Sequence, residues 1–212
     1  MIDSRKNWWL FPTILAVGLI ADQILKFYIK LNFTLGESFE IFPWFQLVFV
    51  ENPGMAFGVT LGSKLFLTLF RIVVSGLIIW YVVKLVKKGF NAGYLVIVTL
   101  ILTGAIGNII DCVSYGRIFT QSTFATLATL AEAGNGYGGW FTGMVVDMFY
   151  FPLFTIPDWV PVVGGDIFFS PVFNLADSCI TVGIICILLF YRHAFNQSLD
   201  AVGMGDKKKV SE

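Results

Sequence analysis

The sequence lacks the residues of several common kinds of site. It contains a single histidine, His193, and no His-Glu-x-x-His pattern, which argues against a zinc peptidase. Its three cysteines, Cys112, Cys179 and Cys186, have no metal-ligand spacing. Basic and acidic residues balance at 14 each, so the bulk charge gives no argument for a nucleic-acid partner.

Charge is also scarce, whereas apolar residues are abundant. Only 13% of the 212 residues are charged and 57% are hydrophobic, which predicts an all-α integral membrane protein. We expect a single membrane domain over residues 1–212. Four apolar stretches are long enough to span a bilayer, at residues 9–29, 65–86, 94–110 and 173–191. The loops between them would be residues 30–64 and 111–172, and the tail residues 192–212.

Basic residues predict how these spans are oriented. One side would carry Arg5, Lys6, Lys84, Lys87, Lys88, Arg192 and Lys207 to Lys209. The loops of the other side hold only Lys30, Lys64 and Arg117. Because positive residues favour the cytoplasmic side, we expect both termini in the cytoplasm and loops 30–64 and 111–172 outside.

Unusual polar residues converge at one depth in this topology. An acid inside a span costs roughly 2.5–3.5 kcal/mol, so we interpret Asp177 as functional rather than as a helix cap. Asn174 precedes it by three residues and would share its helical face. The predicted site lies on the extracytoplasmic side and gathers Asp22, Lys26, Asn52, Asn108, Asp111, Asp147, Asn174 and Asp177.

Some of these residues also have simpler interpretations. Asp22 and Lys26 are four apart, so a structural ion pair within one helix is favoured. Asn108 and Asp111 could end a helix or line a site, and the sequence leaves both open. Asp147 is a lone acid in an apolar segment and does not identify a function by itself.

Three other functions use the same residues. A proton- or ion-coupled transporter could use Asp22, Lys26 and Asp177 as a relay, although clustering at one depth argues against it. A Ser–Lys peptidase could use Ser178 and Lys26. A structural protein would tolerate asparagine at Asp147 or Asp177.

Five motifs follow one another along the chain. They are Asp22-x-x-x-Lys26, Asn52-Pro-Gly54-Met-Ala-Phe-Gly58, Gly104-Ala-Ile-Gly-Asn108-Ile-Ile-Asp111, Val145-Val-Asp147 and Phe173-Asn174-Leu-Ala-Asp177-Ser178. In this order they resemble the bacterial lipoprotein signal peptidase family (signal peptidase II), from the first span to the last.

The resemblance implies an intramembrane aspartic endopeptidase without a metal or cofactor. Such an enzyme removes the signal peptide of diacylglyceryl-modified prolipoproteins by cleaving before the lipidated cysteine. Asp147 and Asp177 correspond to the catalytic pair, and Asn108 and Asn174 to site-lining residues. Other signature positions are Asp22, Lys26, Asn52, Gly54 and Asp111.

The resemblance also implies surroundings for the site. The family has four membrane helices and a small extracytoplasmic β-cradle, which suits the strand-like run Phe45 to Val50. We expect a monomer in the bacterial cytoplasmic (inner) membrane, in contact with lipid and inhibited by cyclic peptides of the globomycin type. Its active site would face the extracytoplasmic side.

The sequence departs from the family pattern in two places. Cys112 stands where the family usually has arginine after the aspartate, and Arg117 could supply that charge. The segment from Asp111 to Asp147 is longer than usual, and we expect a short helix at Phe124 to Glu132 and a turn at Gly134 to Gly139. Residues 151–170 would form a surface loop that could cover the site as a lid.

Overall fold

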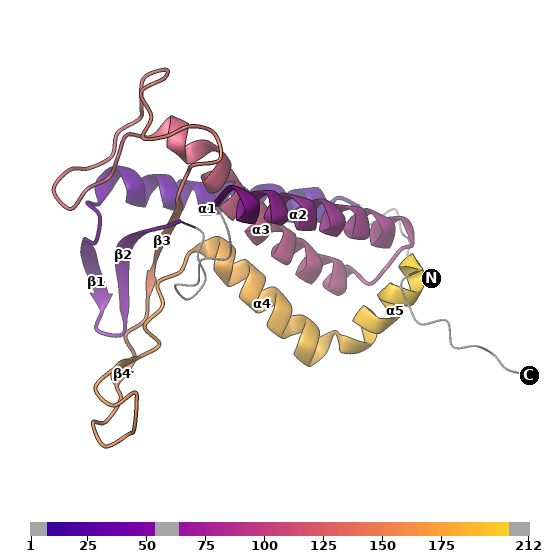
Figure 1. Cartoon of the computed structure of the whole chain (residues 1–212). Helices are drawn as coiled ribbons and strands as arrows, with labels where there is room; N and C mark the ends of the chain where they lie inside the picture. Colours follow the sequence, from indigo (N-terminus) through magenta and orange to yellow (C-terminus); the bar gives the residue numbers. More distant parts are fainter. Residues whose placement is uncertain (1–7, 54–63, 204–212) are drawn as a thin grey trace, which may run out of the picture. The chain divides into compact units, whose positions relative to one another are not determined.

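The computed structural model describes residues 8–53 and 64–203, which form five helices and five strands (Figure 1). The helices are α1 (Leu10–Asn32), α2 (Lys64–Lys87), α3 (Ala92–Ile118), α4 (Leu175–Phe190) and α5 (Arg192–Val202). The strands are β1 (Ser38–Phe42), β2 (Phe45–Asn52), β3 (Val145–Tyr150), β4 (Phe154–Thr155) and β5 (Ile167–Phe168).

The long helices confirm the predicted class, a multi-pass membrane protein. Helices α1, α2 and α3 are each long and apolar enough to cross a membrane, and α4 with α5 makes a fourth crossing if the bent pair counts as one. Apolar side chains such as Ile24 and Leu77 are about 60% exposed on these helices. Such surfaces are stable only in a hydrocarbon environment.

Helix α3 continues eight residues past the predicted end of its span. Asp111 and Cys112 therefore lie inside the helix, and the loop expected from residue 111 begins after Ile118. The expected boundary was wrong because a charged residue was taken to end the span. The Asp111 side chain is fully buried and paired with Lys26, so its charge does not interrupt the helix.

The helix in the fourth apolar segment is shorter than the span predicted at residues 173–191. Helix α4 begins at Leu175, so Asn174 precedes the helix and Asp177 is its third residue. The chain then bends by 96° into α5, which lies within the predicted tail. The bend lets α5 pack Ala194 and Val202 against a core that includes Val82.

Strands β1, β2 and β3 form an antiparallel sheet in that order, which confirms a small sheet containing Phe45 to Val50. The third strand comes from far along the chain and was not predicted. In β2, Leu47 pairs with Phe149 but Val50 pairs with Asp147, so β2 contains one extra residue, a β-bulge.

The connection after α3 has no helix at Phe124 to Glu132, so that prediction was wrong. Thr120 and Thr129 hold this segment instead. The backbone N–H of Thr120 donates to the Thr129 carbonyl oxygen, and the backbone N–H of Thr129 donates to the Thr120 hydroxyl, both at 2.9 Å. Threonine hydroxyls compete in this way with helical hydrogen bonds. The turn predicted around Gly134 is present, with φ +92° at that glycine.

The described residues belong to two compact units. Unit 1 comprises residues 8–21, Phe70–Gly107 and residues 176–203. Unit 2 comprises residues 22–53 and 64–69 with Asn108–Leu175. The core of unit 2 consists of Ile29, Phe33, Phe49, Tyr115, Phe119, Val146 and Met148.

Candidate active site

Lys26 is the centre of a buried polar network in unit 2. Its ammonium group lies 2.9 Å from Asp22 Oδ2 and 2.8 Å from Asp111 Oδ2, and it donates to Asn108 Oδ1 at 3.0 Å. An ammonium group has three hydrogens, so each has an acceptor. The expected Asp22–Lys26 pair is confirmed, and Asn108 and Asp111 take part in the network as well as belonging to α3.

Gln23 is a member of this network that the sequence patterns missed. Its amide nitrogen donates to Asp22 Oδ2 at 3.1 Å and to Asp111 Oδ1 at 3.0 Å. Its amide oxygen accepts from the Tyr115 hydroxyl at 3.0 Å. A glutamine beside an acid carries no recognisable spacing, so only the packing of α1 on α3 reveals this role.

Asp147 is a buried carboxylate with both oxygens hydrogen-bonded. Asn174 donates to Oδ1 at 2.6 Å, and Asn52 donates to Oδ2 at 3.1 Å. Asn174 also donates to Asn108 Oδ1 at 3.1 Å. Because Asn108 is bonded to Lys26, hydrogen bonds connect the ion pairs of α1 to the carboxylate on β3.

Backbone pairing explains how these side chains meet. Asn52 pairs with Val145, two residues before Asp147, so the side chains of Asn52 and Asp147 lie on one face of the sheet. Phe173 is bonded to the same strand, since its carbonyl accepts from Met148 and Phe149 and its N–H donates to Phe149. This attachment brings the next residue, Asn174, to Asp147.

A second buried ion pair lies on the other face of β2. Lys30 is fully buried in α1, although it was predicted to belong to a loop. It pairs with Glu51 and donates to the Ser122 hydroxyl at 2.9 Å. The expectation was wrong because α1 extends to Asn32. The four-residue spacing of Asp22, Lys26 and Lys30 was a signal for one polar face.

Aromatic rings enclose the Lys30 ammonium group. It lies 5.7 Å from the ring centroid of Phe49, 5.4 Å from that of Phe119 and 5.0 Å from that of Tyr137, distances typical of cation–π contacts. The Tyr137 hydroxyl accepts the N–H of Met144, the residue before β3. Burial raises the pKa of Tyr137, which keeps this hydroxyl protonated. The Lys30 cluster therefore contacts β2 through Phe49 and, through Tyr137, the residue that precedes the strand of Asp147.

The remaining predicted residues have different placements. Asp177 is half-buried in the first turn of α4 and belongs to unit 1, whereas the other described site residues belong to unit 2. Gly54 lies outside the described residues. Arg117 is exposed in the last turn of α3, 5.5 Å from the ring centroid of Trp140. Cys112 is buried beside Asp111, whose paired cation is Lys26.

Together the apolar helices and the buried acid–amide network define a membrane protein with a polar site. Residues 14–192 match the family model described as signal peptidase (SPase) II, and the chain belongs to this peptidase family. It is 49% identical over 192 residues to a lipoprotein signal peptidase of Porphyromonas gingivalis, covering 88% of this chain and 84% of the relative. The counterpart of Amoebophilus asiaticus is 36% identical over 202 residues, covering 91% and 81%.

Two solved structures share the fold. One bacterial membrane enzyme superposes with a TM-score of 0.60 at 24% identity, covering 97% of this chain and 94% of that one. A second gives a TM-score of 0.56 at 26% identity, covering 86% and 92%. These similarities extend over most of the chain.

Proposed function

We propose that this protein is an intramembrane aspartic peptidase that removes signal peptides from lipoprotein precursors. Its family and the names of its relatives support the substrate class. The observation that carries the catalytic assignment is the buried Asp147 carboxylate, oriented through both oxygens by Asn52 and Asn174. A buried, oriented acid in a membrane protein is costly unless it has a function.

Asp177 is the second catalytic carboxylate in this proposal. It follows Asn174 by three residues, so the segment that holds Asp147 also carries Asp177. Two carboxylates close together share a proton, because ionising both is unfavourable. The ionised member takes a proton from a water molecule while the protonated member polarises the scissile carbonyl. After the water oxygen attacks, the leaving amine receives a proton and the peptide bond breaks.

The bonding of Lys26 supports an aspartic mechanism over a Ser–Lys mechanism. A lysine acts as general base only when its nitrogen has a free lone pair. Lys26 donates all three hydrogens, to Asp22, Asp111 and Asn108, which stabilises the ammonium form. Its role in this proposal is to hold the network that orients Asp147.

The proposed substrate carries a diacylglyceryl group on the cysteine after the cleavage site. A signal-peptide helix would lie among the spans with this cysteine at the membrane boundary, and the acyl chains would stay in lipid. The family and its bacterial relatives support a location in the bacterial cytoplasmic membrane. The basic residues at the helix ends support a site that faces outward. Lipidation would then contribute to recognition.

Cleavage of a lipidated prolipoprotein by the purified protein tests the proposal. The parent protein is compared with Asp147→Asn, Asp177→Asn and Ser178→Ala, and an unlipidated precursor serves as the substrate control. We expect cleavage by the parent and by Ser178→Ala, with loss in both asparagine variants that retain the parent's thermal unfolding midpoint. Cleavage that survives either asparagine substitution would exclude the aspartate pair, and loss only in Ser178→Ala would indicate a serine peptidase.

A further inference from the structure

An apolar β-hairpin separates the strand of Asp147 from the helix of Asp177. Strands β4 and β5 pair at Phe154 with Phe168 and at Thr155 with Ile167, and the two phenylalanine rings stack at 4.7 Å. The hairpin extends beyond the three-stranded sheet of unit 2 (Figure 1). Its large apolar side chains are exposed, namely Leu153, Phe154, Trp159, Val162, Ile167 and Phe168.

Among the described residues, no packing contact explains the conformation of Val162 at the tip. Its side chain is fully exposed, and its φ of +72° is strained for a β-branched residue. Glycine would adopt this conformation without strain. Trp159 on the same tip is 82% exposed. A strained, fully exposed valine beside an exposed tryptophan indicates an apolar partner outside this chain.

Part of the backbone of the tip is hydrogen-bonded within the tip. Within residues 156–166, five N–H groups donate to carbonyl oxygens of the same segment: those of Ile156, Val160, Gly164, Gly165 and Asp166. Pro157 and Pro161 have no N–H group, so seven of the eleven positions have no donor left to hydrate. This partial internal satisfaction lowers the cost of leaving bulk water, and the N–H groups of Trp159 and Val162 can still be hydrated at the headgroup boundary.

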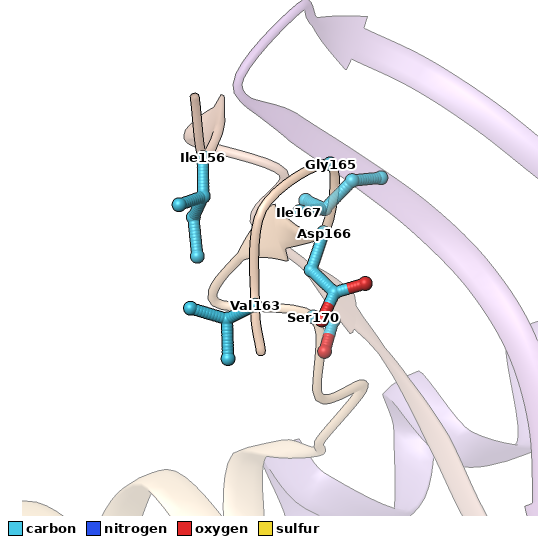
Figure 2. A pocket seen from close by; sticks show the side chains of 6 residues that line it. All are labelled: Ile156, Val163, Gly165, Asp166, Ile167 and Ser170. Carbon is cyan, nitrogen blue, oxygen red and sulfur yellow. The ribbon is translucent and has the colours of Figure 1, made fainter. Parts of the chain in front are cut away.

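The acids of the hairpin limit how deeply it can insert. A hollow of about 560 Å³ has Ile156 and Val163 on one side and Asp166 and Ser170 on the other (Figure 2). Asp166 thus lies opposite these apolar side chains. Asp158, beside Trp159, is exposed. A carboxylate there suits the headgroup boundary, the depth at which tryptophan is also enriched.

The hairpin is attached close to a membrane helix. Five residue steps separate Ser170 from Leu175, the start of α4, a distance of roughly 18 Å at most. Apart from Thr181, the exposed residues of α4 are apolar and require lipid: Val182, Ile184, Ile185, Leu188, Leu189 and Phe190. We propose that the β4–β5 hairpin is a membrane anchor whose tip, with Trp159 and Val162, inserts at the headgroup–acyl boundary of the bilayer. This anchor does not depend on the proposed peptidase activity.

Fluorescence of Trp159 in defined bilayers tests the anchor. The full-length protein is reconstituted into phosphatidylcholine vesicles with or without bromine on the acyl chains. The signal of Trp159 is isolated as the difference between the parent and Trp159→Phe. We expect this signal to fall about twofold or more with brominated lipid and to resist aqueous iodide. The Trp140 signal, isolated in the same way with Trp140→Phe, gives the extent of quenching for an exposed tryptophan outside the hairpin.

The Val162→Gly variant distinguishes a hairpin tip that anchors the protein in the membrane from one that is only a structural turn. Glycine removes the side chain and relieves the backbone strain, so the thermal unfolding midpoint in detergent should stay unchanged or rise. An anchor predicts weaker quenching of Trp159 by brominated lipid in this variant. Trp159 quenched by iodide but not by brominated lipid would overturn the proposal. Protection of Trp159 that arises only on addition of a lipidated precursor would also overturn it, in favour of substrate as the partner.

Discussion

The amide nitrogen of Asn174 lies 2.6 Å from Asp147 Oδ1 and 3.1 Å from Asn108 Oδ1. This one side chain, placed just before α4, joins the carboxylate on β3 to the network on α1 and α3. The carboxylate is therefore oriented by three segments that are distant in sequence. Loss of this contact should affect turnover before it affects the fold.

Asn174→Ala should lower kcat/KM roughly 10- to 100-fold, because a hydrogen bond to a charged group contributes roughly 1.5–3 kcal/mol. Cleavage of a lipidated precursor peptide measures the effect. Asn32→Ala is the matched control, since that exposed asparagine bonds only its own helix at the Tyr28 carbonyl oxygen. Equal kinetics in the two variants would contradict the role given to Asn174.

Lys30→Met should lower the thermal unfolding midpoint strongly, because it leaves the Glu51 carboxylate buried without its cation. Breaking a buried ion pair from one side costs roughly 3–5 kcal/mol. Removing both charges, in Lys30→Met with Glu51→Met, should restore part of the loss. Unfolding of both single variants and the double variant in detergent gives the coupling free energy between the two side chains. Simple additivity of the unfolding free energies would show that the two groups do not interact.

Lys26→Met should destabilise the protein by a similar amount and abolish cleavage, since Asp22 and Asp111 then face each other without a cation. Adding Asp111→Asn removes one of the two charges and should recover stability but not activity. Unfolding midpoints and cleavage rates of the same samples test this. A fully active Lys26→Met protein would show that the network does not orient Asp147.

Gly143→Ala should destabilise the protein by about 1–3 kcal/mol, because a methyl group there overlaps the backbone carbonyl oxygen of Asp111. Gly139→Ala is the matched control in the same connection, since its added methyl group meets nothing within 4 Å. Thermal unfolding compares them. Similar midpoints would mean that the chain before β3 does not need close contact with α3.

Hydropathy predicted both ends of α2 and the start of α1 to within one residue, because apolar runs begin or end there at turns or charges. It placed the end of α1 too early, before Lys30. It failed at the end of α3, where Asp111 is neutralised by a residue 85 positions earlier, a relation that no local pattern contains. The spacing of Asp22 and Lys26 was enough to predict their ion pair. The contacts of Asn52 and Asn174 with Asp147 depend on the register of two strands and on one backbone attachment at Phe173.

The bulge in β2 decides which side chain reaches Asp147. Because of the extra residue between Leu47 and Val50, the Asn52 side chain lies on the same face of the sheet as that of Asp147. The Glu51 side chain lies on the opposite face. If the pairing of Leu47 with Phe149 continued to the end of β2 without the bulge, Glu51 would pair with Val145 in place of Asn52. Glu51 would then face the Asp147 carboxylate, and Lys30 would face an amide. A chain with every site residue intact would then place a negative charge beside Asp147, so the chemistry of the site depends on counting residues along a strand.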